Sequence, residues 1–145
     1  MDNIKINLLE SKIKKRIIKL KIIISEKRVT YSRMHTKNKC LSTLSTIYNN
    51  VNVKNNLEYI ATNEIPILIC DLVEIHIGRY CLIKSLESLS NMIYKYSKLI
   101  NKQRFHENNK RDKLENEIKD LKNQNKSLNE QIAFMNSPLV PTQST

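Results

Sequence analysis

The stretch that decides the fold is residues 111–135, which read RDKLENEIKDLKNQNKSLNEQIAFM. With Leu114 placed at heptad position d, apolar residues recur at positions a and d through to Met135. A stripe this narrow cannot be buried by one helix alone, so it needs a partner. The pattern predicts a coiled coil over Arg111–Met135. The fold class it predicts is all-α, a small helical domain followed by a long helix that ends in a short coiled coil.

The register of this coiled coil favours a parallel homodimer. Asn125 falls at a, where a buried amide can pair with its twin across a two-fold axis at some cost in stability. In a parallel pair Lys110 faces Glu115 and Glu117 faces Lys122, and both contacts join opposite charges. The predicted dimerisation residues are Leu114, Ile118, Leu121, Asn125, Leu128, Ile132 and Met135. The competing interpretation is that this helix packs back onto its own domain.

Residues 111–135 resemble the zipper half of the basic-leucine-zipper family. That family places an Arg ten residues before the first zipper Leu and an Asn eight residues before that Arg. Arg104 matches the first position, but Tyr96 stands in place of the Asn. Apolar Ile93 and Ile100 also lie where a helix that reads a DNA groove carries Lys and Arg. The resemblance therefore implies dimerisation and does not extend to base-specific DNA binding.

Helical periodicity extends upstream of the zipper. Apolar residues recur every three or four positions over residues 4–28, which predicts an amphipathic helix. Residues 79–135 predict one long helix or two stacked ones. Within them a second seam, out of phase with the zipper, is separated from it by the polar joint 101–110. That seam consists of Leu82, Leu86, Leu89, Ile93, Tyr96 and Ile100.

The middle of the chain is less regular. Residues 29–56 predict only a short helix around Leu41–Asn49 and an Asn-rich loop over Asn49–Asn56. Residues 65–77 fit a buried helix capped by Asn63 and stopped by Gly78, or alternatively a pair of strands. The expected organisation is a basic helix and small helical core over 1–78, a heptad-patterned helix with its joint over 79–110, the zipper over 111–135, and a disordered tail over 136–145.

Positive charge is concentrated near the N-terminus. The chain carries a net charge of +11, and residues 1–40 contain 12 Lys and Arg against 3 Asp and Glu. An excess of this kind attracts nucleic acid, an acidic membrane surface or an acidic protein. An ordinary solvated helix face is the plain alternative. The candidate polyanion-binding residues are Lys12, Lys14, Lys15, Arg16, Lys19, Lys21, Lys27, Arg28, Lys102 and Arg104.

Several classes of function are disfavoured. The single glycine, Gly78, leaves no Gly-rich phosphate loop or dinucleotide fingerprint, and no catalytic motif is present. Cys70, His76 and Cys81 carry metal-ligand atoms, but they lack the paired spacing of structural zinc sites. We therefore expect no enzyme activity, cofactor, metal or small-molecule substrate.

Cysteine usage and hydropathy bear on the location of the protein. An odd number of cysteines, Cys40, Cys70 and Cys81, predicts reduced thiols and an intracellular protein, cytoplasmic or nuclear. We expect no signal peptide, since lysines interrupt the first apolar run, and no transmembrane segment.

Three functions fit these patterns. The leading hypothesis is a non-enzymatic homodimer that binds a polyanion, chiefly nucleic acid, without strong sequence preference. The first alternative is a structural adaptor or scaffold subunit, of a virus for example, that acts through its coiled coil. The second is a peripheral protein that binds an anionic membrane through the basic N-terminal helix.

Overall fold

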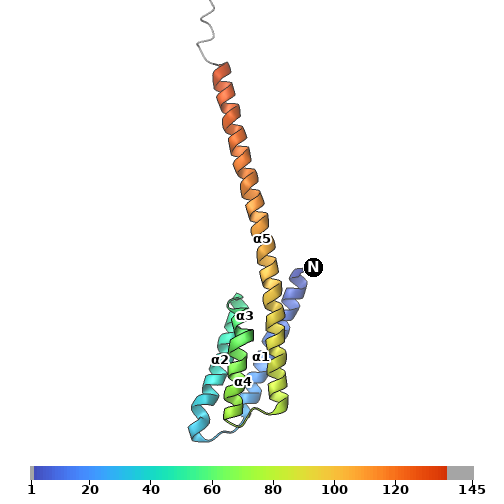
Figure 1. Ribbon diagram of the computed structural model, residues 1–145, viewed down its shortest axis with the longest axis vertical. Helices are drawn as coiled ribbons and strands as arrows, with labels where there is room; N and C mark the ends of the chain where they lie inside the picture. The colour runs from blue at the N-terminus through green and yellow to red at the C-terminus, as the bar shows by residue number, and fades with distance from the viewer. Residues whose placement is uncertain (1, 137–145) are drawn as a thin grey trace, which may run out of the picture. The chain divides into compact units, whose positions relative to one another are not determined.

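The computed structural model describes residues 2–136 and confirms the all-α class, with no strand in that range. The predicted tail over 136–145 lies, apart from Asn136, outside the described residues. The chain divides into two compact units, Met1–Gln103 and Arg104–Thr145. The first unit is an up-and-down bundle of helices, as Figure 1 shows. The helical segments are α1 (Asp2–Glu26), η1 (Tyr31–Arg33), α2 (Met34–Val53), α3 (Leu57–Tyr59), η2 (Ile60–Glu64), α4 (Ile65–Glu74) and α5 (Tyr80–Met135).

Polar contacts within the first unit fix the alternating direction of its helices. Asn3 near the start of α1 accepts a hydrogen bond from Gln103, at 2.6 Å, and Arg16 donates to Ser85 further along. As the residue number increases along α1, the number of its partner on α5 decreases, so these two helices are antiparallel. The same reasoning makes α2 antiparallel to α1, since Lys14 reaches Asn52 while Lys37 reaches the last turn of α1.

Helix α1 confirms the amphipathic helix predicted over 4–28. Its inward stripe is fully enclosed, and Leu9 packs against the core at its edge. Burying such aliphatic side chains contributes about 1.5–3 kcal/mol each before entropy costs. The buried residues of α1 are Ile6, Ile13, Ile17, Leu20 and Ile24.

Helix α2 is longer than its sequence indicated, and the loop predicted over Asn49–Asn56 was wrong over most of its length. The helix runs from Met34 to Val53 and ends where Lys54 adopts a left-handed conformation. Its asparagines lie mostly on the solvent side, where they need not break the helix. The inward side is periodic at intervals of 3, 4, 3 and 4 residues, and it holds Lys37, Cys40, Leu44, Ile47 and Val51.

Residues 57–74 form one continuous helical stretch, so the strand alternative for 65–77 is excluded and Asn63 caps nothing. A π-helical turn, η2, interrupts the α-helical pattern, and the Ile65 N–H bonds to the Ile60 carbonyl five residues back. A wide turn leaves backbone carbonyls without their usual partners. The Ser90 hydroxyl of α5 donates to one of them, Ala61 O, at 2.6 Å.

Helix α4 ends in a Schellman motif that corrects the predicted stop at Gly78. His76 adopts a left-handed φ of 62°, the Ile77 N–H bonds to Leu72 O, and the His76 N–H bonds to Val73 O. Leu72 and Ile77 are both buried, as this motif favours. Glycine at position 78 lets the chain pass close to helix α4, because a Cβ there would lie 2.9 Å from the Val73 backbone nitrogen.

Helix α5 contributes to both units. Its seam from Leu82 to Ile100 is buried in the first unit, with Tyr96 the largest enclosed side chain. The core was expected within residues 1–78, but the bundle also includes the first part of α5. Without α5, the inward sides of α1 and of residues 57–74 would be uncovered. From Arg104 onward the same helix is the sole helix of the second unit's described part.

Candidate interaction surfaces

The predicted zipper is an apolar stripe that no described residue of its unit covers. Every residue from 104 to 136 is exposed, and the a and d side chains expose 52–58% of their surface, rising to 77% at Met135. A lone helix has no second surface within that unit to cover these side chains. The residues concerned are Leu114, Ile118, Leu121, Leu128, Ile132 and Met135, with Asn125 also exposed among them.

Phe134 is an exposed aromatic that the heptad pattern did not single out. It is 78% exposed and lies one residue before Met135, beside the stripe. Phe105, at the start of the second unit, is likewise exposed and meets the His106 ring edge-on. The sequence signal for both was simply an aromatic residue in a polar stretch.

The structure separates the candidate polyanion-binding residues into two groups, the first of which makes contacts inside the bundle. Lys14 donates to Asn52 at 2.7 Å, pairs with Glu10 at 3.4 Å and lies over the Tyr48 ring. The Arg16 guanidinium donates to Ser85 at 3.3 Å. These contacts connect α1 to α2 and α5. Lys21 and Lys27 are half-buried.

The second group is exposed to solvent. On α1 it consists of Lys12, Lys15 and Lys19, for which no ion pair or hydrogen bond occurs among residues 2–136. Arg28 lies just after the helix, and Lys102 and Arg104 lie on α5, where all three are exposed. A polyanion would therefore reach three regularly spaced lysines of one helix face.

Those lysines share their face with exposed aliphatic side chains that sequence reasoning missed. Ile4, Leu8, Ile18 and Ile22 expose 64, 59, 49 and 53% of their surface. Together with Ser11 and Lys15 they are spaced 4, 3, 4, 3 and 4 residues apart, and that spacing was the signal that could have revealed them. We call this surface the outer face of α1; it comprises Ile4, Leu8, Ser11, Lys12, Lys15, Ile18, Lys19 and Ile22.

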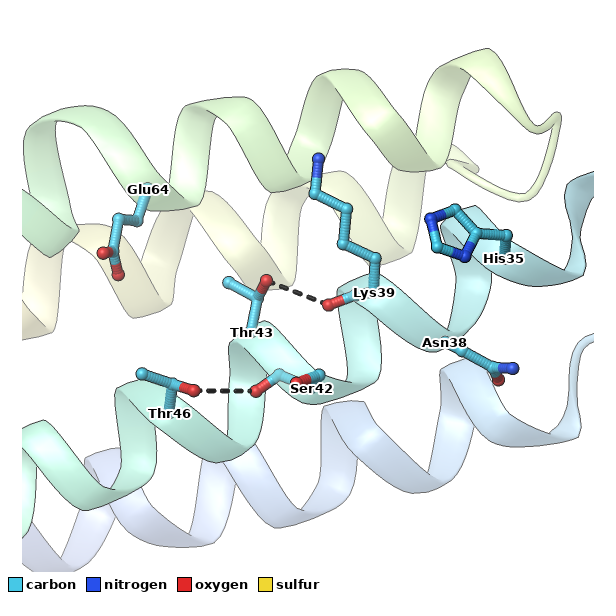
Figure 2. Close-up of a pocket in the computed structure, with 7 residues that line it drawn as sticks. All are labelled: His35, Asn38, Lys39, Ser42, Thr43, Thr46 and Glu64. Carbon is cyan, nitrogen blue, oxygen red and sulfur yellow. Dashed lines mark hydrogen bonds between the residues drawn. The ribbon is translucent and has the colours of Figure 1, made fainter.

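A polar groove runs between α2 and the π turn η2. It encloses about 430 Å³ and is lined by one side of α2, while Glu64 of η2 points toward α2 from the opposite wall, as Figure 2 shows. The Thr43 and Thr46 hydroxyls donate to carbonyls of their own helix, so they present oxygen lone pairs to the groove. One carboxylate oxygen of Glu64 is buried without a hydrogen-bond partner. The α2 residues along it are His35, Asn38, Lys39, Ser42, Thr43 and Thr46.

The three thiols and His76 belong to no cluster of metal-ligating side chains among the described residues. Residues 2–136 contain no group of three or more His, Cys, Asp or Glu side chains placed to hold a metal ion. Cys70 and Cys81 are exposed, whereas Cys40 is buried on α2. Burial raises the pKa of the Cys40 thiol from 9.0 to about 11; the Asp71 carboxylate adds to the rise and Lys39 opposes it. Cys40 is therefore a neutral core side chain at physiological pH.

Comparison with known proteins found no relative of this chain. The chain matches no protein-family model, no curated protein and no solved structure. In the part of the chain that the structure describes, none of the helices combines the length and hydropathy needed to cross a membrane.

Proposed function

We propose that the protein is a non-enzymatic homodimer, held by a parallel coiled coil over Arg111–Met135, that presents the basic face of each bundle to a polyanion. The observation that carries the proposal is the apolar stripe of α5. Its a and d side chains stay more than half exposed in a unit whose described part contains no other helix. A second copy of the same helix covers that stripe with matching side chains.

Charge complementarity supports a parallel arrangement of the two copies. In that register the Lys110 of one copy approaches Glu115 of the other, and Glu117 approaches Lys122. Each such pair contributes a few tenths of a kcal/mol. Asn125 meets its own twin at the same level, which satisfies both amides only when the two helices are in register.

The polyanion half of the proposal is supported by the exposed lysines of α1. Lys12, Lys15 and Lys19 follow one another along a single face, so they can meet a row of negative charges together. Nucleic acid is the polyanion that the composition favoured. Its binding should weaken steeply with salt, because each lysine–phosphate contact releases a condensed counterion.

Light scattering of the whole chain tests the assembly. We expect a dimer at tens of micromolar, and we expect Leu121→Asp to be monomeric because a carboxylate cannot be buried at position d without a partner. The matched control is Asn116→Asp, which adds the same charge at the outward position f and should stay dimeric. A monomeric wild type would overturn the proposal.

A further inference from the structure

We propose that the outer face of α1 docks on an anionic lipid surface, with its aliphatic side chains among the headgroups and its lysines on their phosphates and carboxylates. This inference rests on the polyanion-binding half of the proposed function, and it commits to anionic lipid where the composition alone favoured nucleic acid. The helix would lie in the plane of the interface and would not cross it.

The shape of the face fits a flat surface. Ile4, Leu8, Ile18 and Ile22 lie on one line along α1, directly away from the stripe that the bundle buries. The first and last of them are 18 residues apart, which spans about 27 Å of helix. The bundle already holds α1 as a helix, so docking would not have to fold it. A preorganised amphipathic surface avoids the entropy cost that a disordered segment meets at a membrane.

The charge of the face selects an anionic surface. Lys12, Lys15 and Lys19 are exposed within it, and Lys5 is exposed at its edge. Two carboxylates stand on described side chains of α1: Glu10 is paired with Lys14 on the side of α2. Glu26, the last residue of the helix, is exposed four residues after Ile22, so one carboxylate lies at the C-terminal end of the face, away from Lys12 and Lys15. Long lysine side chains can lay their methylene groups along the apolar region while the ammonium groups reach the headgroups.

A second helix fits this face less well than a lipid surface does. The six positions from Ile4 to Ile22 have heptad spacing, but the two central ones are Ser11 and Lys15. In a coiled coil Lys15 would have to bury its ammonium group in the seam, which costs stability. At a lipid interface the same side chain extends to the anionic headgroups.

Nucleic acid would use only part of the face. Phosphates are contacted by Lys and Arg, and no gain follows from placing four large aliphatic side chains against a charged backbone. A lipid surface uses both kinds of side chain, and exposed aliphatic clusters rimmed by polar residues are typical of interaction sites.

Vesicle flotation of the full chain tests the inference, with phosphatidylcholine vesicles that contain phosphatidylserine as the anionic lipid. We expect the wild type to float with these vesicles and to sediment with pure phosphatidylcholine. The triple variant K12Q/K15Q/K19Q should bind roughly fivefold more weakly per lysine, or on the order of a hundredfold in total. The matched control, K113Q/K119Q/K126Q, removes the same charge from exposed positions off the zipper stripe and should bind as the wild type does.

The apolar half of the face is tested separately. The variant I4S/L8S/I18S/I22S should lose at least tenfold in lipid affinity while its binding to a 30-base-pair duplex is unchanged. Its control, I67S/V73S, removes exposed aliphatic side chains of α4 and should float normally. Circular dichroism establishes that each variant is folded; should the four-serine variant unfold, I18S/I22S replaces it.

Three outcomes would overturn the inference: a wild type that does not float, a four-serine variant that floats like the wild type, or lysine variants that lose duplex binding alone. Light scattering and the L121D variant keep this result apart from the assembly. A monomeric wild type that still floats would refute the proposed dimer and leave the lipid surface standing. A dimer that does not float would refute the lipid surface and leave the proposed dimer standing.

Discussion

Lys37 shows at the residue scale that a charged side chain of the basic N-terminal segment can serve the fold. It is only 8% exposed, and its ammonium group donates to the carbonyls of Ser25 and Lys27 at 2.9 and 2.7 Å. These carbonyls lie at the end of α1, where helix carbonyls lack partners and the helix dipole is negative. Lys37 meets these two carbonyls only when α2 packs on α1, so no local sequence pattern predicts the contact.

Replacing Lys37 by Met should therefore lower the free energy of unfolding by about 2 kcal/mol, because two part-buried carbonyls lose a charged donor. Urea unfolding followed by circular dichroism measures the change. Lys39→Met is the matched control, since Lys39 is exposed and its contact with Asp71 is long, at 3.7 Å. That control should change stability by less than about 0.5 kcal/mol. Equal effects of the two substitutions would contradict the capping role.

Cys40 makes stability depend on pH in the alkaline range. Its pKa is raised to about 11 in the folded state, against 9.0 for the free thiol, so the unfolded chain loses this proton first. Stability from this group is complete below pH 9 and falls as pH rises through 11, by up to about 3 kcal/mol. Unfolding under reducing conditions at pH 8 and pH 10.5 measures it. The pH-dependent loss should be smaller in Cys40→Ala, and an identical loss in both proteins would refute it.

At the scale of the element, periodicity predicted α1 and the seams of α5 because their apolar residues are regularly spaced. The same rule applied to Cys40, Leu44, Ile47 and Val51 would have extended α2 to its full length, but the asparagines between them suggested a loop. The π turn η2 could not be predicted. Its wide turn is supported by the Ser90 hydroxyl, which comes from α5 and meets Ala61 only in the folded bundle.

Of the two candidate surfaces, one could be predicted from the sequence and the other could not. The stripe of the proposed zipper was visible in the sequence because its apolar residues repeat at heptad spacing along one helix. The outer face of α1 was hidden, since its aliphatic residues alternate with those of the buried stripe and only burial tells the two sets apart. The internal roles of Lys14 and Arg16 likewise depend on partners from α2 and α5.

Asn125 is the residue of α5 that should set the number of helices in the proposed coiled coil. Asn125→Leu removes a buried polar pair, so we expect a more stable assembly that no longer stops at two copies. Analytical ultracentrifugation gives the distribution of masses. Asn123→Leu adds the same side chain at the outward position f and should remain a dimer. An unchanged mass and stability for Asn125→Leu would place that residue outside the interface.

At the scale of the whole molecule, the core and the proposed assembly surface belong to different units. The buried hydrophobic residues of the described chain run from Ile6 to Ile100, all within Met1–Gln103. A chain ending at Gln103 should therefore fold as a monomer with a melting temperature independent of its concentration. The full chain should melt at higher temperature as its concentration rises, because dissociation is linked to its stability. Calorimetry at two concentrations compares them; a truncated chain that is unfolded would show that the bundle depends on the second unit.

The outer face of α1 should also affect the solubility of the protein in concentrated solution. At low ionic strength the net charge of +11 keeps molecules apart. Raising salt to about 1 M shortens the screening length to about 3 Å, which removes that repulsion. The four aliphatic side chains of each α1 then attract one another unopposed, so precipitation should set in with added salt, and serine at those positions should delay it.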